Sequence, residues 1–163
     1  MSIRWRSELS LDGSLLDEDH RHLIAIVNRF DGDCAAEGNR PALRRALADL
    51  RQYTQQHFAR EERLMREVGY PADARHEHED AHRALSTRLD TLVRHYETSA
   101  DEDGLAEVVW ETADLLKHWL VDHVIRFDLP LKPYLAKPHL RRAVRLWAAG
   151  PAESRRRAVA APF

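Results

Sequence analysis

Histidine and carboxylate side chains recur at one-turn spacing along this chain, inside stripes that are otherwise apolar. The segment HFAREERLM places His57 and Glu61 four residues apart, and HEDAH does the same for His78 and His82. Residues four apart share one face of a helix, so each pair points to the same side. A buried, unpaired polar group costs about 2–7 kcal/mol, so these groups need partners. Either they form salt bridges at the surface, or together they hold a metal ion.

Helical phase separates the histidines that face the interior from those that face water. His20 and His123 lie on the apolar stripes of their own segments, as the two pairs above do. Glu62 falls off the stripe that carries Glu61, so Glu61 is the inward carboxylate of the two. Four histidines lie off the stripes and are expected to face water: His22, His76, His95 and His118.

Five inward histidines in one chain favour a metal site. A single one is more often a satisfied core residue than a ligand. Five of them, accompanied by Glu61 and by the candidate carboxylates Asp17 and Asp128, need more partners than aliphatic stripes supply. Imidazole and carboxylate ligands without thiolate suit iron, manganese or zinc. The single cysteine, Cys34, excludes an internal disulfide and a thiolate-rich zinc site.

Four long amphipathic segments must position these residues. Apolar spacing and stop signals predict helices over 15–37, 41–68 and 73–99. A fourth is expected to follow Gly104 and to end near Asp128, because Pro130 cannot continue it. Helices of this length joined by short loops are typical of an up-down-up-down four-helix bundle. No segment shows sustained period-two alternation, so the predicted fold class is all-α.

The length of 163 residues suits about one domain. We expect the bundle over 1–135, with an N-terminal arm whose Trp5 covers one end of the core, and a basic extension over 136–163 that forms a short helix and then a disordered end. Residues 137–163 hold seven basic side chains and one acidic one, while the rest of the chain is acidic on balance. No apolar run approaches the ~18 residues of a membrane span and no signal peptide opens the chain, so a cytosolic protein is expected.

Four motifs resemble those of the hemerythrins, specifically the bacterial single-domain type. They are LDEDHRHL around His20, HFAREERLM from His57, HEDAH from His78 and WLVDHVIRFD up to Asp128, and the resemblance covers about residues 3–135. It implies a centre of two non-haem iron ions with a bridging oxo or hydroxo group, and dioxygen as ligand. The residues that match the family's ligands are His20, His57, Glu61, His78, His82, His123 and Asp128, with the two carboxylates bridging both ions.

Two positions in this set depend on the resemblance. Five α-helical steps place Asp128 about 140° from His123. His118 and Asp122, four residues apart, have the more regular spacing but face water, so the resemblance settles the choice of Asp128. The segment before the third motif is a couple of residues longer than is usual in the family, which leaves His76 as an alternative to His78, although Asp80 and not a histidine lies four residues after His76.

The ligand count leaves room for a small molecule. Two octahedral ions need about twelve bonds. Under the family assignment the histidines supply about five of these, the bridging carboxylates about four and an oxo or hydroxo bridge two more, so one position is open for dioxygen. Phase predicts that apolar side chains line that pocket and keep water out. They are Leu23, Trp119, Leu120 and Phe127.

The leading expectation is reversible dioxygen binding for storage, delivery or scavenging, with at most a weak oxidase or peroxidase activity. Ferritin-like di-iron enzymes use Glu-x-x-His pairs, and the inward stripes carry none. Two alternatives stay open: a sensor of dioxygen, redox state or nitric oxide that acts through the basic tail, and a di-iron enzyme of the peroxidase or nitric-oxide-handling type. We expect no nucleic-acid partner, because the body of the protein is acidic. A protein partner is the candidate for binding to the basic tail. The expected oligomeric state is a monomer or a small oligomer.

Overall fold

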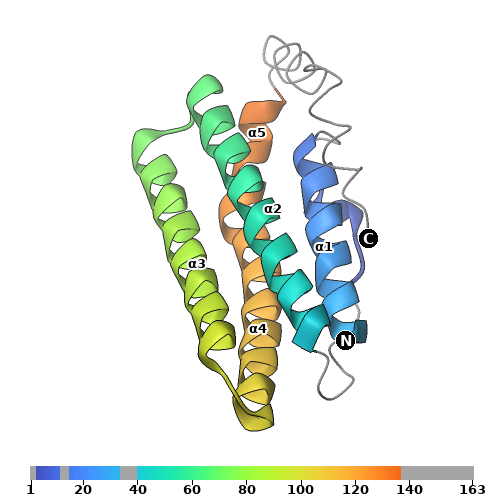
Figure 1. Ribbon diagram of the computed structural model, residues 1–163. Helices are drawn as coiled ribbons and strands as arrows, with labels where there is room; N and C mark the ends of the chain where they lie inside the picture. Colours follow the sequence, from blue (N-terminus) through green and yellow to red (C-terminus); the bar gives the residue numbers. More distant parts are fainter. Residues whose placement is uncertain (1–2, 12–14, 34–39, 137–163) are drawn as a thin grey trace, which may run out of the picture.

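Four long helices make up most of the molecule. The computed structural model describes residues 3–11, 15–33 and 40–136, the side chains of 31–33, 117, 118, 120 and 121 excepted. The helices follow one another in antiparallel order, and each packs against its neighbours, with α1 closing the ring against α4 (Figure 1). The predicted all-α four-helix bundle is therefore confirmed. The elements are η1 (Ser7–Leu9), α1 (Leu15–Asp33), α2 (Arg40–Glu67), α3 (Ala72–Thr98) and α4 (Glu102–His123).

Local signals explain where α2 ends and where α4 begins. Gly69 has a φ of 66°, and the N–H of Tyr70 bonds back across the last turn at 2.9 Å, which closes α2 as a Schellman motif. Asp101 accepts a hydrogen bond from the backbone N–H of Gly104 at 2.9 Å and so caps the N-terminus of α4. The fourth helix therefore begins at Glu102, and the prediction that it follows Gly104 was wrong.

The helical path does not end near Asp128 as predicted. It continues through a π-helical turn, η2 (Val124–Asp128), a 3-10 turn, η3 (Leu129–Leu131), and α5 (Lys132–Leu135). The N–H of the residue after η2 bonds to the carbonyl of Val124, five positions earlier, which is the π pattern. Pro130 lies in the first turn of η3, where its missing N–H is not required, so the proline accompanies a change of helix type and not a stop.

The N-terminal arm is docked along α1. Ile3 exchanges two hydrogen bonds with the side chain of Asn28, at 2.8 and 2.9 Å. Asp17 accepts hydrogen bonds from the Ser10 hydroxyl at 2.6 Å and from the N–H of Leu11 at 2.8 Å. The buried carboxylate of Asp17 thus holds the arm where it joins the bundle.

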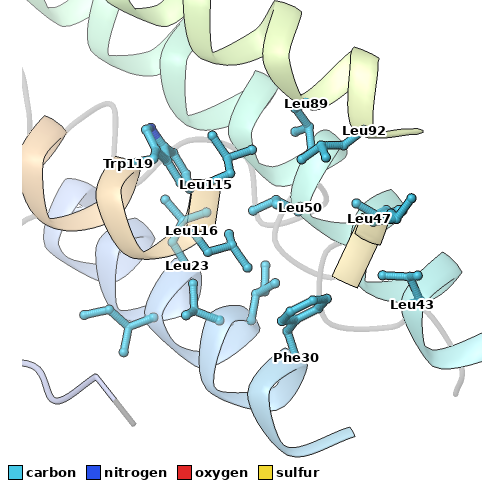
Figure 2. Close-up of a cluster of buried hydrophobic side chains, with 14 of the residues drawn as sticks. Leu23, Phe30, Leu43, Leu47, Leu50, Leu89, Leu92, Leu115, Leu116 and Trp119 are labelled. Carbon is cyan, nitrogen blue, oxygen red and sulfur yellow. The ribbon is translucent and has the colours of Figure 1, made fainter. Parts of the chain in front are cut away.

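The core consists of two apolar clusters. The larger one runs along the interior of the four helices, with Leu23, Leu50 and Trp119 among its members (Figure 2). Trp5 of the N-terminal arm packs half-buried against this cluster. The smaller cluster joins the arm, the end of α2 and the segment around α5. Its members are Leu11, Leu16, Leu64, Met65, Val68, Tyr70, Leu131 and Leu135. Buried polar residues occupy the inward faces of the helices between the two apolar clusters.

Some predictions fall outside the described residues. The short helix and the basic extension lie in 137–163, and the predicted C-terminal part of the first helix lies in 34–37. Within the described part of the chain, no helix combines the length and the apolar character needed to cross a bilayer.

Candidate metal centre

Seven polar side chains lie together between the two apolar clusters, and we call them the polar layer. Every one of them exposes 5% or less of its surface. All four helices contribute, and η2 supplies the last member. The members are His20 from α1, His57 and Glu61 from α2, His78 and His82 from α3, His123 from α4 and Asp128 from η2. The structure therefore brings together all seven residues that match the family's ligands.

The donor atoms of the polar layer fall into two sets. One consists of Glu61, His78, His82 and His123, and the other of His20, His57, Glu61 and Asp128; the donor atoms of each set lie within 4.8 Å of one another. Glu61 belongs to both. Its Oε2 atom lies 3.6, 3.5 and 3.3 Å from the Nε2 atoms of His57, His78 and His82. One glutamate oxygen thus faces histidines of both sets.

The two oxygens of Asp128 also face different sets. Oδ1 lies 3.1 Å from His78 Nε2 and 3.2 Å from His123 Nε2, whereas Oδ2 lies 3.1 Å from His20 Nε2. The π-turn explains how Asp128 reaches this place. In a π-turn the backbone hydrogen bonds join residues five apart, so Asp128 lies on the same face as His123. Five-residue spacing in an α-helix would place the two residues on different faces.

The spacing of these atoms fits cations. The Nε2 atoms of His78 and His123 lie 3.1 Å apart, and neighbouring ligands at about 2.1 Å from an octahedral ion lie about 3.0 Å apart. Among the described residues, neither oxygen of Glu61 or of Asp128 has a hydrogen-bond partner, nor does Nε2 of His82. Buried polar atoms without a hydrogen-bond partner require another kind of partner. One cation in each donor set would supply it.

The electrostatics of the layer keep its acids ionised. Burial and the nearby Asp128 raise the pKa of Glu61, but the surrounding histidines outweigh both and hold it below its usual value. Burial opposes the ionisation of Asp128 too, and its histidine partners hold its pKa well below the usual value. For His78 burial lowers the pKa, but the two carboxylates outweigh it and raise the pKa to about 9. For His82 burial prevails and lowers the pKa.

Asp19 supports the layer from outside, and sequence reasoning missed it. This carboxylate is 2% exposed, and its Oδ2 lies 3.4 Å from Nδ1 of His57. Burial raises the pKa of Asp19, but His57 and Arg60 outweigh it and lower the pKa. Helical phase could have found it, because Asp19 lies three residues after Leu16 and four before Leu23 on the inward side of α1.

Two neighbours of His82 were also missed. Glu62, predicted to lie off the inward stripe, accepts a hydrogen bond at 3.1 Å from the Nδ1 side of the His82 ring. The Phe58 ring stacks on a face of the His82 imidazole, with 3.8 Å between ring centroids and 13° between the ring planes. The available signal for Phe58 was its position directly after His57. Adjacent residues of a helix point in different directions, so in a bundle the two side chains can face two different neighbouring helices.

The predicted pocket walls are distributed unevenly around the layer. Leu23 is fully buried in the larger apolar cluster, and Trp119 is 6% exposed and meets Phe58 edge-on at 6.1 Å. Phe127 lies against His78 and His123, at 5.4 and 5.2 Å between ring centroids. The side chain of the fourth predicted wall residue, Leu120, is outside the described residues. Phe127 and Trp119 therefore lie on the side of the layer that carries three histidines.

The competing ligand candidates are placed elsewhere. His76 is exposed, so it does not compete with the buried His78. Asp17 is buried, but the hydrogen bonds described above direct its carboxylate to the arm. His22 is exposed, as predicted, and stacks on the Tyr53 ring at 4.1 Å.

A four-helix bundle that gathers five histidines and two acids in one buried layer defines a class of metal-binding helical proteins. Within that class, a model of the hemerythrin HHE cation binding domain matches residues 13–135. The chain belongs to the hemerythrin family, which confirms the resemblance seen in the sequence.

Named relatives agree with this assignment. The chain is 28% identical over 141 residues to a bacteriohemerythrin of Stenotrophomonas maltophilia, an alignment that covers 86% of each protein. It is 30% identical over 130 residues to a bacteriohemerythrin of Methylococcus capsulatus, covering 80% of this chain and 93% of that one. A hemerythrin-like protein of Naegleria gruberi is 26% identical over 133 residues, with 82% and 93% covered.

Proposed function

We propose that this protein binds dioxygen reversibly at a non-haem di-iron centre held by the polar layer. His78, His82 and His123 would hold one ion and His20 and His57 the other, with Glu61 and Asp128 shared between the two. Two ferrous ions, when bound, supply a coordination position and the electrons that dioxygen takes up and returns. The supporting observation is that the donors form two sets joined by Glu61.

The unequal number of histidines supports a binding position at one ion. The set with three histidines offers its cation more protein donors than the set with two, once the shared carboxylates are counted for both. A cation on the His20 and His57 side is therefore the one with a position to spare. Six-coordinate geometry is the working assumption of this count.

The apolar clusters on both sides of the layer support reversible binding. Leu16 and Leu64 on one side and Leu23 on the other are each 3% exposed or less, so water reaches the layer with difficulty. Water exclusion preserves a ferrous centre, because solvent access promotes irreversible oxidation. The prevalence of imidazole over carboxylate also favours binding over the oxidative chemistry of carboxylate-rich di-iron enzymes. We therefore propose a binding protein and not an enzyme.

Iron quantification with absorption spectroscopy tests this function. The reduced protein should contain two iron ions per chain, gain a visible charge-transfer band when dioxygen is added, and lose it again under vacuum. An iron content of one ion or none contradicts the di-iron centre. A band that disappears irreversibly while an added reductant is consumed contradicts reversible binding and indicates an enzyme.

A further inference from the structure

Asp19 is a buried carboxylate outside the polar layer that contacts one of its histidines. It lies on α1, directly before His20. Its Oδ2 accepts a hydrogen bond from Arg60 Nε at 2.7 Å and lies 3.4 Å from Nδ1 of His57. Its Oδ1 accepts a hydrogen bond from the Tyr53 hydroxyl at 2.9 Å. Three side chains from α2 therefore converge on one carboxylate from α1.

His57 meets a carboxylate at each of its ring nitrogens. Nδ1 faces Asp19, and Nε2 lies 3.6 Å from Oε2 of Glu61 inside the layer. When Asp19 accepts a hydrogen bond from Nδ1–H, the proton of the neutral imidazole stays on Nδ1 and the lone pair is on Nε2, the nitrogen that points into the layer. Asp19 thus sets both the orientation and the tautomer that a ligand histidine needs.

This support differs from what the other histidines receive. His20 shares the two-histidine set with His57, and its Nδ1 has no hydrogen-bond partner among the described residues. In the three-histidine set, Glu62 supports His82 from a position that is 30% exposed, where water can replace it. The two-histidine set has one imidazole fewer than the other set. Of its two imidazoles, His57 is held by the buried carboxylate of Asp19, which water does not reach.

We infer that Asp19 is a positioning residue that holds His57 for the cation of the two-histidine set. The inference rests on the proposed function, since it takes each set to hold an iron ion. Arg60 and Tyr53 act on Asp19 in turn, because a buried carboxylate stays ionised only where a cation and hydrogen-bond donors compensate it. The ion that depends on Asp19 is the one with a position to spare for dioxygen.

Two variants of Asp19 and one matched control test this role. Asp19→Asn keeps the size and one acceptor oxygen but removes the charge, and Asp19→Ala removes both. Asp17→Asn is the control, because Asp17 is also a buried carboxylate of α1 but its carboxylate holds the arm. The full-length proteins are loaded with ferrous iron without oxygen. Iron released to a ferrous chelator is then counted per chain over time, with circular dichroism as a measure of folding.

The expected result is that one of the two iron ions leaves faster from the Asp19 variants. Removal of a carboxylate behind a ligand histidine lowers metal affinity about ten- to a hundredfold. We expect that loss in the release rate, so release should be up to about tenfold faster in Asp19→Asn and about a hundredfold faster in Asp19→Ala. The second ion should leave at the wild-type rate, and Asp17→Asn should release both ions as the wild type does. Wild-type release from both Asp19 variants overturns the inference. So does loss of both ions together in proportion to loss of helix, which is what a structural role alone produces.

Two further comparisons separate the possible failures. If the wild-type chain does not hold two iron ions, the proposed function itself fails, whereas a stable wild-type pair with unaffected Asp19 variants removes only the role of Asp19. If the Asp19 variants do not fold, Tyr53→Phe decides, because it removes one hydrogen bond to Asp19 from a half-buried position. A severalfold faster release of one ion then supports the inference, and an unchanged rate overturns it.

Discussion

Two adjacent glutamates, Glu61 and Glu62, approach His82 at opposite nitrogens of its ring. Glu61 lies 3.3 Å from Nε2 inside the polar layer, and Glu62 lies 3.1 Å from Nδ1 at its outer edge. The side chain of Glu61 is fully buried, whereas that of Glu62 is 30% exposed. The same chemical group thus has two different tasks one position apart, which makes the pair a natural comparison.

Glu61→Gln should abolish the binding of both iron ions, because it removes the charge that the two donor sets share. Glu62→Gln should keep two ions per chain with at most about a tenfold loss of affinity, the lower end of the effect seen for partners of ligand histidines, since water can take its place. Iron per chain after gel filtration gives the answer. Equal iron content in the two variants would contradict the division of tasks between them.

The raised pKa of His78 predicts a pH dependence for the metal-free protein. A folded-state pKa of about 9 against an ordinary value of 6.5 means that protonated His78 contributes stability below pH 6.5, which is lost as the pH rises through about 9. Bound iron replaces that proton, so the loaded protein should show no such loss. Thermal unfolding midpoints measured from pH 6 to 9.5 should therefore diverge with rising pH. Parallel curves for the two forms would contradict this account.

At the residue scale, helical periodicity predicted the inward histidines because the core of a bundle follows it. His20, His57 and the pair on α3 sit on regular stripes, and the structure places all of them in the polar layer. Helical phase could have placed Asp19 on the inward side of α1, but its role appears only once α2 lies beside α1 and supplies the three partners of its carboxylate. The partner of a buried charge on another helix cannot be read from one helix alone.

At the scale of elements, the π-turn after α4 decides whether Asp128 can join the layer. Its five residues occupy the space of a four-residue α-helical step, so His123 and Asp128 share a face despite their spacing. Deletion of Ile125, a 49% exposed residue of this turn, should restore an ordinary α-helix with four-residue spacing and keep both iron ions. Insertion of one alanine after Ile125 should abolish iron binding.

Iron content and helical circular dichroism of the two length variants check this. A deletion variant that folds but binds no iron would show that the π-turn itself is required, and not merely the shared face that it creates. Sequence reasoning could not have anticipated the turn, because five-residue spacing has no place in α-helical phase. Asp128 was one of two candidate carboxylates, and the resemblance settled the choice of Asp128 as a ligand. The start of α4, by contrast, was readable from the capping residue Asp101.

At the scale of the whole molecule, the polar layer joins two apolar clusters, so bound iron should contribute to folding stability. A ligand present at a thousandfold excess over its Kd stabilises the folded state by about 4 kcal/mol per site. For a chain of this size, that corresponds to about 10 °C in the unfolding midpoint for each ion. Chelation should lower the midpoint of the wild type by at least this amount and leave Glu61→Gln nearly unchanged. An unaltered wild-type midpoint would contradict a structural contribution from iron.

The whole fold was predictable because four amphipathic segments with short connections have few ways to bury their stripes. The order of the four helices and the bounds of α2 and α3, to within one residue, follow from pattern alone. What pattern could not give is the continuous helical path from Glu102 to Leu135 through three helix types, since each change depends on hydrogen bonds formed after packing.

The location of the polar layer midway between the two apolar clusters also bears on protein turnover. If the polar layer holds iron as proposed, a chain without iron keeps buried carboxylate oxygens without hydrogen-bond partners among the described residues, and it should open more often than a filled chain. Proteolysis of transiently opened states follows their population. Under the proposed function, iron scarcity should therefore lower the amount of this protein, because unfilled chains would be degraded first.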